Sequence, residues 1–492
     1  MSGKRRNRIY IIGAGFAGMS IARDIRAKEI LGEVVAFLDD DPGKIGTRID
    51  GVPVLGPIEA VAEIVDKTPA DEALIAIPSA GREKLRQLYQ LLENADFAKI
   101  RILPAVSQII EGDAHFIQTR ELNPEDLLGR NPVKIGLRES LRYLRGKRVV
   151  ITGAGGSIGS ELARQLLSGG AQRLYLFGHG ENSIYEIDRE LRLLQEEGVG
   201  ERATIVPVIG ELQDRDYMRF ILKRLKADVI FPAAAYKHVP MVEANPVVAV
   251  KNNVLGTQNL VVAALEAGTE RFVLISTDKV VEPTCVYGAS KKLAEEIVLA
   301  ARSNHGSYMV VRFGNVLGSR GSIVPLFHQQ IAKGGPVTIT DPEVSRFFMT
   351  IPEASSLVLK AGGVGDPGAL YVLDMGEPVR IQDLAEQMIR FYGYEPHSEI
   401  GVSYIGLRTG EKLTESPIGP GERPCDTPYP RIKRLEREAP AAGWLAEVIE
   451  ELRPVCRFDP ERPGVFRNRR ALREALARHF PTLESKPDEP EY

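Results

Sequence analysis

The chain has 492 residues, of which 43% are hydrophobic and 26% are charged, and its formal net charge at pH 7 is −3. This composition is ordinary for a globular enzyme, so it excludes fibrous, repeat and disordered classes, and the length is too great for a single hydrophobic core. The charge is near neutral and no long basic run is present, so nothing attracts the chain electrostatically to nucleic acid or to an anionic membrane surface.

The cysteines and the N-terminus indicate the compartment. Cys285, Cys425 and Cys456 are odd in number and widely spaced, which argues against a disulfide framework and against a zinc site. The basic N-terminus precedes an apolar run of only a few residues, so it predicts a strand rather than a signal peptide or a membrane span. We therefore expect a cytoplasmic protein without a bound metal.

The first predicted domain, residues 1–122, is a Rossmann-like α/β unit that opens with RIYIIGAGFAGMSIARDI and continues through EVVAFLDDD and EALIAIPS. Gly13, Gly15 and Gly18 have the G-x-G-x-x-G spacing of a dinucleotide-binding turn, and Asp39 follows the next strand, where an acidic side chain can bind a ribose hydroxyl. A tight turn in a domain that binds nothing is an equal alternative.

Residues 123–145 are rich in turn-forming residues and predict a linker to a second domain at 146–440. That domain alternates helical patterns with the apolar runs KRVVIT, RLYLFG, ATIVPVIG, ADVIFPAAA, RFVLIS and SYMVVRFGN. This alternation predicts a parallel, doubly wound sheet with ligands at the carboxyl ends of its strands. The pattern is less regular from about residue 315, which suits a substrate-binding lobe, and residues 441–492 predict a helical extension with a polar tail.

The second domain begins with a glycine turn of its own. In VVITGAGGSIGS, Gly153, Gly156 and Gly159 lie between a strand and a helix, where the backbone can approach a pyrophosphate at the helix N-terminus. The segment STDKVVEPTCVYGASKK then places residues 276–279 at a strand end and spaces Tyr287 and Lys291 as Y-x-x-x-K. Four residues are about one helical turn, so the lysine can stabilise the tyrosinate and make Tyr287 a base near neutral pH.

Together these segments resemble the extended short-chain dehydrogenase family, specifically the polysaccharide-biosynthesis nucleotide-sugar dehydratases. The resemblance covers about residues 123–433. It is carried by the segments DLLGR, TGAGGSIGSEL, FGHGENSIYEI, AAAYKHVPMVEANP, STDK, YGASK, RFGNVLGSRGSIVPLF, SRFFMTIPEA and GLRTGEKL.

The resemblance implies a 4,6-dehydration of a nucleotide sugar with tightly bound NAD that is regenerated in every turnover. Tyr287, supported by Lys291, is then expected to remove the C4 hydroxyl proton, and Thr277 to hydrogen-bond the same oxygen. Asp278 and Lys279 are expected to supply the acid and the base that eliminate the C6 hydroxyl. An Asp-Lys pair resembles the branch that acts on UDP-N-acetylglucosamine.

The resemblance also implies two binding sets. The cofactor-binding set is Gly153, Gly156, Ser157, Ile158, Gly159, Glu211, Ala233, Tyr287 and Lys291. The substrate-binding set is Lys237, His238, Asn315, Arg346, Arg408 and Glu411. Arginine suits a diphosphate because its planar fork donates two hydrogen bonds. His238 fits equally well as a histidine that supports the site without touching the ligand.

Three features depart from the family pattern. The long, two-domain members generally have methionine where this chain has Tyr287, whereas the short inverting members have tyrosine, so retention and inversion at C5 both remain open. The long members also carry four membrane helices before the first Rossmann unit, and this chain resembles a version without them. Glu211 stands where relatives usually have aspartate near the adenine.

Two other functions fit part of the pattern. A nucleotide-sugar 4-epimerase shares Tyr287, Lys291 and NAD but needs no Asp-Lys pair, and a non-catalytic nucleotide-sugar sensor needs only the fold. The first domain resembles CoA-binding-like and nucleotide-sugar-binding Rossmann domains, which makes it either a sensor or a packing domain. By analogy with the fold we also expect a homo-oligomer.

Overall fold

The computed structural model describes residues 7–28, 32–77, 141–200, 202–301, 306–391 and 394–484, together with residues 84, 87–88, 91–92, 94–95, 97, 99–102 and 120–121. Most of the predicted linker, including DLLGR, and the polar tail from residue 485 lie outside the described residues. The predicted boundaries at 122 and 146 therefore stay predictions. The chain divides into two compact units, each of which has its own sheet.

The N-terminal unit is built on a sheet with the strand order β2-β1-β5-β6-β7, in which only the β6–β7 pair is antiparallel. Its elements are β1 (Arg8–Ile12), α1 (Phe16–Lys28), β2 (Glu33–Leu38), β3 (Arg48–Ile49), β4 (Val52–Pro53), η1 (Ile58–Ala60), α2 (Val61–Lys67), β5 (Glu72–Ile75), β6 (Lys99–Ile102) and β7 (Arg120–Glu121). Ile9 and Ile11 of β1 enter one core, and Tyr10 and Ile12 enter the other. Because β1 is buried on both faces, its sequence is a continuous apolar run.

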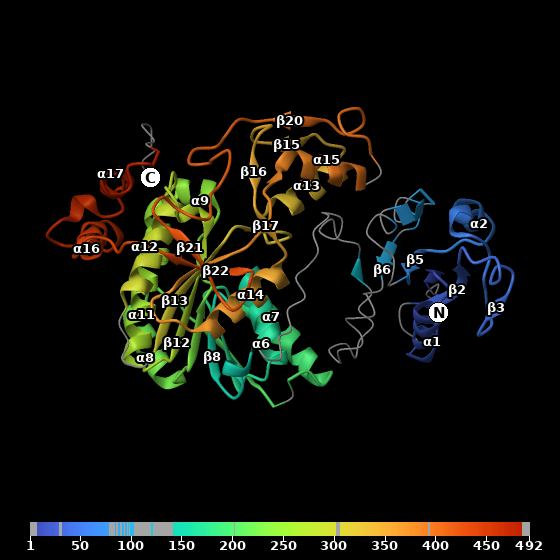
Figure 1. The fold of residues 1–492 in the computed structure, drawn as a ribbon, viewed down its shortest axis with the longest axis horizontal. Helices are drawn as coiled ribbons and strands as arrows, with labels where there is room; N and C mark the ends of the chain where they lie inside the picture. Colours follow the sequence, from blue (N-terminus) through green and yellow to red (C-terminus); the bar gives the residue numbers. More distant parts are fainter. Residues whose placement is uncertain are drawn as a thin grey trace. The chain divides into compact units, whose positions relative to one another are not determined.

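The second unit is built on a sheet of nine strands with the order β10-β9-β8-β11-β12-β13-β18-β22-β21 (Figure 1). The strands are β8 (Arg148–Thr152), β9 (Arg173–Gly178), β10 (Thr204–Ile209), β11 (Val229–Pro232), β12 (Arg271–Thr277), β13 (Ser307–Phe313), β18 (Leu370–Leu373), β21 (Arg423–Asp426) and β22 (Ile432–Glu436). All neighbours from β10 to β18 pair in parallel, whereas β22 pairs antiparallel with β18 and β21. The strand order reverses between β8 and β11, and such a point is where doubly wound folds bind ligands.

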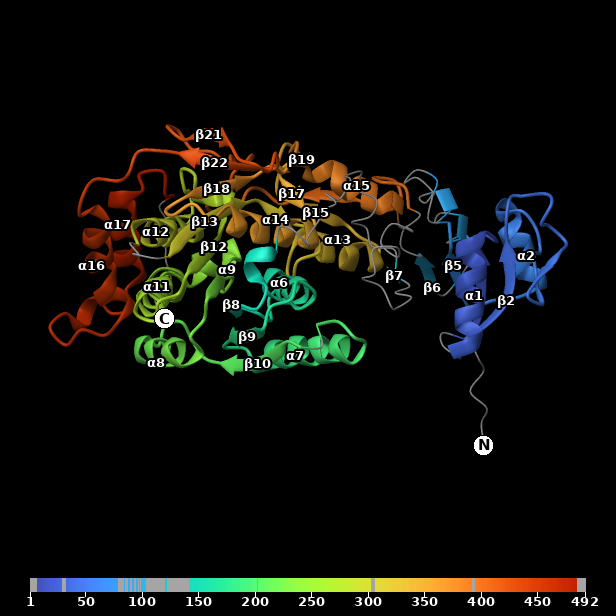
Figure 2. The same ribbon diagram turned by 60° about the horizontal axis from the view of Figure 1, so that its bottom comes forward.

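Helices cover both faces of this sheet (Figure 2). One core takes apolar side chains from α6 (Ser157–Ser168), α7 (Glu181–Glu196) and α14 (Ile351–Val364). The other takes them from α8 (Arg215–Leu225), α10 (Pro246–Val250), α11 (Thr257–Glu266), α12 (Val286–Ala300), α16 (Trp444–Cys456) and α17 (Arg469–His479). Two Rossmann-like sheets are therefore present, and the predicted α/β fold class is confirmed.

Shorter elements complete the second half of the chain. They are η3 (Arg142–Leu144), α9 (Val239–Ala244), the π-helical turn η4 (Lys251–Gly256), η5 (Asp278–Val280), β14 (Asn315–Val316), α13 (Ile323–Ala332), β15 (Val337–Ile339), β16 (Ser345–Arg346), β17 (Phe348–Met349), β19 (Val379–Arg380), α15 (Ile381–Phe391), β20 (Val402–Tyr404) and η6 (Pro463–Val465). The pairs β14–β17 and β16–β19 are two-residue ladders. Such short pieces lack a regular hydrophobic period, which is why the sequence beyond residue 315 reads as irregular.

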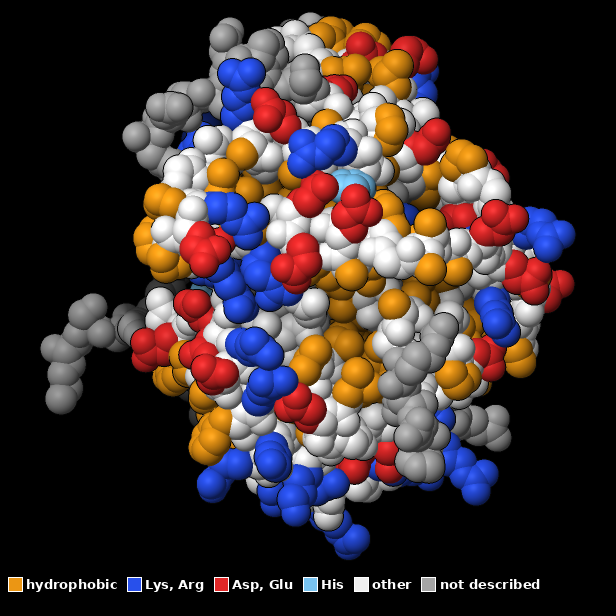
Figure 3. Space-filling view, turned by 90° about the vertical axis from the view of Figure 1, so that its left-hand side faces the viewer, with side chains coloured by type: hydrophobic (Ala, Val, Ile, Leu, Met, Phe, Trp, Pro, Cys, Tyr) orange, Lys and Arg blue, Asp and Glu red, His pale blue; other side chains and the backbone are white. Residues whose placement is uncertain are grey.

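The face that carries α16 and α17 mixes acidic and basic side chains, with hydrophobic groups exposed between them (Figure 3). This face therefore presents no broad field of a single sign. Among the described residues, no helix combines the length and the apolar character that crossing a bilayer requires.

Candidate active site

The glycines of the turn between β8 and α6 differ in how much space surrounds them. A Cβ at Gly153, where φ is +66°, would come within 2.7 Å of the Ala234 nitrogen, and one at Gly159 within 2.2 Å of the Gly153 oxygen. Both positions therefore exclude any side chain. Gly156 is less crowded and faces a cavity, so this is where the backbone can approach a ligand.

That cavity has a volume of about 280 Å³ and lies at the carboxyl ends of β8, β9 and β11. The predicted cofactor residues Gly153, Gly156, Glu211 and Ala233 line it. Ser157, Ile158 and Gly159 belong instead to the first turn of α6 and are not lining residues. Sequence analysis did not predict the other lining residues, among them Gly155, His179, Asn252 and Arg320.

The cavity suits a dinucleotide. Gly156 is the N-cap of α6 and supplies no side-chain cap, so the N–H groups of the first turn are available to a ligand. Free N–H groups and the positive end of the helix dipole favour a diphosphate. Residues 153–159 could therefore hold the diphosphate of NAD, and Glu211 lines the same cavity.

A second cavity, of about 330 Å³, brings together most of the predicted chemistry. The predicted residues that line it are Lys237, His238, Thr277, Lys279, Tyr287, Asn315, Arg346, Arg408 and Glu411. These residues come from distant parts of the sequence and meet because β11 and β12 end at the same edge of the sheet. Asp278 and Lys291 are not lining residues, and Glu415, which sequence analysis did not single out, is one.

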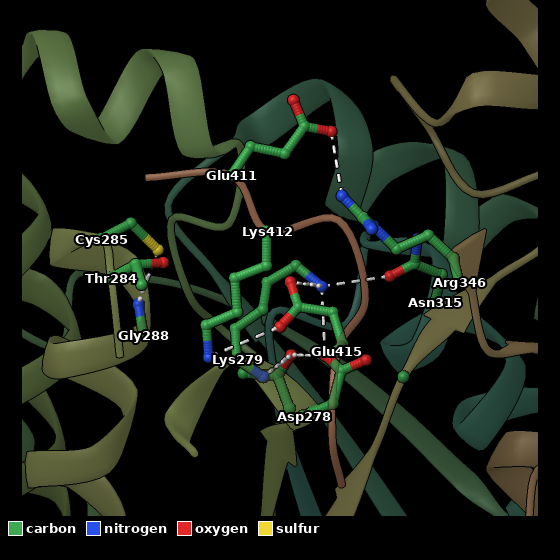
Figure 4. Close-up of polar contacts among 12 residues, drawn as sticks. Asp278, Lys279, Thr284, Cys285, Gly288, Asn315, Arg346, Glu411, Lys412 and Glu415 are labelled. Carbon is green, nitrogen blue, oxygen red and sulfur yellow. Dashed lines mark hydrogen bonds and ion pairs between the residues drawn. The ribbon is translucent and has the colours of Figure 1, made fainter. Parts of the chain in front are cut away.

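Lys279 lies at the centre of this cavity's polar network (Figure 4). Its Nζ donates to Asp278 Oδ1 at 3.1 Å and to Asn315 Oδ1 at 3.3 Å, and lies 3.5 Å from Glu415 Oε1. Burial disfavours the ammonium, but the carboxylates of Asp278 and Glu415 outweigh burial and raise the pKa of Lys279 above its usual value. Lys279 is therefore a charged donor at neutral pH.

Tyr287 and Lys291 share a face of α12 as predicted, but their electrostatics differ from the prediction. Burial raises the pKa of Tyr287 to about 12, against the lowering effects of Lys279 and of a hydrogen bond with Thr277. Burial also lowers the pKa of Lys291 to about 8, and its Nζ donates to the Ile275 carbonyl at 2.6 Å. No hydrogen bond joins Tyr287 to Lys291 in the described part of the chain, and Tyr287 as a base near neutral pH stays a prediction. Lys279 lowers the pKa of Tyr287, but its effect is smaller than that of burial.

The backbone passes from β12 into η5 after Thr277, so successive side chains contact different partners. Thr277 Oγ1 donates to Asp278 Oδ1 at 3.0 Å, and the Asp278 side chain is fully buried. Ser276 Oγ donates to Glu295 at 2.6 Å. Ser276 is absent from the cavity lining, so it has a supporting role in the sheet.

The predicted substrate-binding residues differ in how many hydrogen bonds they already make within the protein. Arg346 NH2 donates to Glu411 Oε1 at 2.9 Å, and its NH1 donates to the carbonyls of Ser345 and Leu413. Arg408 has an exposed side chain at the cavity. Lys237 Nζ lies 3.4 Å from Ser319 Oγ, and desolvation lowers its pKa. Arg408 and Lys237 are thus the cations most readily turned toward an anionic ligand.

Arg320 connects the linings of the two cavities. Its NH1 donates to the Gly155 carbonyl at 3.1 Å, and its backbone N–H donates to Ser157 Oγ at 3.1 Å. Its neighbours Ser319 and Gly321 line the cavity of Lys279. The glycine turn and the loop at 319–321 are therefore joined through Arg320, which lies in the segment RFGNVLGSRGSIVPLF but was not singled out from the sequence.

The N-terminal glycine turn is also well formed. A Cβ at Gly18 would lie 1.9 Å from the Gly13 oxygen, whereas nothing lies within 4 Å of one at Gly15. Asp39 Oδ2 accepts from the Ala14 N–H at 2.6 Å and lies 3.2 Å from Lys44 Nζ. The carboxylate predicted to bind a ribose is thus engaged by its own turn, and a ligand there stays a prediction.

Comparison with known proteins finds a separate family match in each half of the chain. A polysaccharide biosynthesis protein family matches residues 149–437, and a CoA-binding domain family matches residues 1–104. The probable polysaccharide biosynthesis protein EpsC of Bacillus subtilis (strain 168) is 42% identical over 451 residues, which are 91% of this chain and 74% of that protein.

Other relatives match the second unit. A UDP-N-acetylglucosamine 4,6-dehydratase (inverting) of Campylobacter jejuni is 30% identical over 275 residues, 55% of this chain and 77% of that protein. A UDP-glucose 4-epimerase of Rickettsia rickettsii is 32% identical over 284 residues, 56% of this chain and 79% of that protein. The X-ray structure of Pen from Bacillus thuringiensis has a TM-score of 0.51 and 32% identity, covering 56% of this chain and 84% of that one. Since the first family matches more than half of the sequence, this chain belongs to the polysaccharide biosynthesis protein family.

Proposed function

We propose that this protein is an NAD-dependent 4,6-dehydratase of a UDP-N-acetylhexosamine, with UDP-N-acetylglucosamine as the substrate to test first. The observation that carries the proposal is the cavity in which Thr277, Lys279 and Tyr287 lie together. A relative named for this reaction, the Campylobacter jejuni protein, supports the choice of substrate.

The reaction needs an oxidation before the elimination. The C5 proton of a hexose is not acidic, but a ketone at C4 makes it so and allows the C6 hydroxyl to leave. NAD, held at the turn between β8 and α6, would supply the hydride chemistry that both the oxidation at C4 and the reduction at C6 require. Residues 153–159 would hold its diphosphate at the first turn of α6.

Tyr287 and Thr277 carry the first half of the reaction in this proposal. Both line the cavity, so a C4 hydroxyl that enters between them meets a phenol and an alcohol. Tyr287 removes the hydroxyl proton and Thr277 orients the oxygen. Lys291, one turn along α12, stabilises the tyrosinate through its charge.

Lys279 and Asp278 carry the elimination in this proposal. Lys279 presents an ammonium to the cavity, and the fully buried Asp278 accepts one of its hydrogen bonds. A protonated donor beside the C6 oxygen helps that oxygen leave as water. The cations Arg408 and Lys237 would bind the diphosphate of the substrate.

An epimerase is the rival reaction, because the Rickettsia rickettsii relative is named for it and shares the same region of the chain. Epimerisation at C4 requires oxidation and reduction of one carbon and no group that releases C6. The charged Lys279 held in the cavity by three acceptors favours the dehydratase.

Incubation of the purified protein with UDP-N-acetylglucosamine separates the functions. A dehydratase yields a product lighter by one water that shows the alkali-induced absorbance of a 4-keto sugar. Isomerisation without a mass change would identify an epimerase, and no turnover of any UDP-sugar would identify a sensor. The ring couplings in the proton NMR spectrum of the product give the configuration at C5.

A further inference from the structure

The C-terminal segment, residues 444–484, contains α16 and α17 and lies outside residues 149–437, which the polysaccharide biosynthesis family matches. Apolar side chains of both helices pack into the same core as α12. Burial of an apolar face is enough to explain why such helices fold against the sheet. It does not explain the polar contacts that this segment makes around residues 283–286, directly before Tyr287.

The first of these polar contacts reaches the start of α12 through Glu243 of α9. Glu243 Oε1 accepts from the Val286 N–H at 2.8 Å. Arg473 of α17 lies 2.7 Å from Glu243 Oε2 and donates to the Glu243 carbonyl at 2.9 Å, and both side chains are buried. A carboxylate at a helix N-terminus satisfies an unpaired N–H and interacts favourably with the positive end of the helix dipole. Arg473 therefore fixes the carboxylate that holds the residue next to Tyr287.

The second contact reaches the loop that carries Arg408. Glu484 Oε2 accepts from the Gly410 N–H at 2.7 Å, and the Glu484 N–H donates to the Thr284 carbonyl at 3.2 Å. Thr284 Oγ1 donates in turn to the Gly410 carbonyl at 2.9 Å. The N–H and the carbonyl of Gly410 are therefore both held, one by the C-terminal segment and the other by the residues before α12.

Gly410 is closely packed at this point. Its φ is +75°, and a Cβ there would lie 2.6 Å from the Cys285 Cβ, so the loop contacts the residue that caps α12. Gly410 lines the cavity, and the next residue, Glu411, accepts from Arg346 at 2.9 Å (Figure 4). Arg408 precedes Gly410 by two residues. The position of Gly410 therefore determines where these cavity side chains lie.

We infer that the C-terminal segment positions the active site at two points. Glu484 holds the loop that carries Arg408. Arg473 and Glu243 hold the start of α12, which carries Tyr287. All three are positioning residues, because they act through their neighbours and none of them is among the described residues that line the cavity. The inference rests on the proposed function for the roles of Arg408 and Tyr287.

Glu484→Ala tests the first point, because it removes the acceptor of the Gly410 N–H. The KM for UDP-N-acetylglucosamine and the Kd for UDP should each rise about fivefold or more, the effect of losing one hydrogen bond, with a smaller change in kcat. Isothermal titration calorimetry measures the Kd for UDP without turnover. Glu484→Gln keeps an acceptor oxygen and should restore most of the affinity.

Glu474→Ala is the matched control, since this exposed α17 carboxylate pairs with Arg470 and lies outside the cavity lining. It should bind UDP as the wild type does. Two results would overturn the inference. One is a wild-type Kd in Glu484→Ala, and the other is a raised Kd that comes with loss of bound NAD and a lower melting temperature, because a contact that only stabilises the fold would affect all three.

Arg473→Lys tests the second point, because an ammonium keeps the charge but cannot reproduce the planar fork that reaches two oxygens of Glu243. In a single turnover, C4 oxidation, seen as the absorbance of reduced nicotinamide, should slow about tenfold as Tyr287 is displaced. The Kd for UDP should stay near the wild-type value. Glu243→Gln gives the same readout if Arg473→Lys does not fold. An oxidation rate within about twofold of wild type would overturn the inference.

Failure of the proposed function is a different result. Wild-type protein that binds UDP but dehydrates no nucleotide sugar would overturn the proposed function, while the Kd for UDP in Glu484→Ala would still support or contradict the positioning of the loop. Wild-type protein that dehydrates UDP-N-acetylglucosamine, with Glu484→Ala binding UDP equally well, would overturn this inference alone. Wild-type protein that does not bind UDP would overturn both.

Discussion

The chain contains two glycine turns, each between a strand and a helix, and of the two units that carry them the second also holds the cavity lined by Lys279 and Tyr287. In each turn the third glycine packs against the first, since a Cβ at Gly18 or Gly159 would lie 1.9 Å or 2.2 Å from a backbone oxygen. The surroundings differ. The first turn is followed by the exposed Phe16, and its neighbouring strand β5 leads into the apolar Ala76, whereas β12 of the second unit ends at Thr277.

The two units share a turn that can bind a phosphate, but they differ in their ionisable side chains. A glycine turn at a helix N-terminus offers N–H groups to a phosphate in either unit. Catalysis additionally needs ionisable groups at the ends of neighbouring strands, and Lys279 and Tyr287 supply them only in the second. The acidic position also differs, because Asp39 caps its own turn while His179 follows β9.

The largest expected difference between the units is in turnover. Lys279→Ala should lower the rate of water loss from UDP-N-acetylglucosamine by at least about 100-fold, because it removes the ammonium proposed to act in the elimination, and should leave bound NAD in place. Lys44→Ala in the N-terminal unit is the matched lysine deletion and should leave turnover unchanged. Mass spectrometry of the product measures both rates, and wild-type turnover in Lys279→Ala would show that the elimination is assigned to the wrong residue.

Replacing the third glycine of either turn should have the next largest effect. Gly159→Ala forces a Cβ onto the Gly153 oxygen and should cost about 2 kcal/mol of unfolding free energy and most of the bound NAD. Gly18→Ala meets an equally close oxygen, but it should destabilise the N-terminal unit without reducing the NAD content. Denaturant unfolding and the absorbance of released nucleotide distinguish the two, and equal NAD loss in both variants would contradict the comparison.

The rate of C4 oxidation in the second unit should depend on pH through Lys291. Burial lowers the pKa of Lys291 to about 8, so its ammonium is present below that pH and lost as the pH rises through it. C4 oxidation should therefore fall above about pH 8, by up to about tenfold per pH unit. Arginine stays protonated throughout this range, so Lys291→Arg should lack this alkaline loss. Rapid-scan absorbance of reduced nicotinamide measures the profile, and a loss that persists unchanged in the variant would exclude Lys291 as its source.

The smallest expected effect comes from Arg320, which ties the second turn to the loop at 319–321. Its ion pair with Glu186 is exposed on both sides, with 66% and 63% of the side chains accessible, so it contributes less than about 1 kcal/mol. Arg320→Ala should speed NAD release by no more than about fivefold and leave the melting temperature nearly unchanged. Fluorescence of bound nucleotide follows the release, and a rate equal to wild type would show that this link does not retain the cofactor.

Local sequence patterns determined the α/β fold class, both glycine turns and nine of the residues that line the second cavity. Strand runs, glycine spacing and Y-x-x-x-K are short-range signals, and parallel strands bring their carboxyl ends to one edge wherever the pattern occurs. The role of each group was decided only by the tertiary structure. Glu415 and Arg320 reach the site from loops without a regular period, and burial sets the charge of Tyr287 and Lys291 through desolvation that no spacing records.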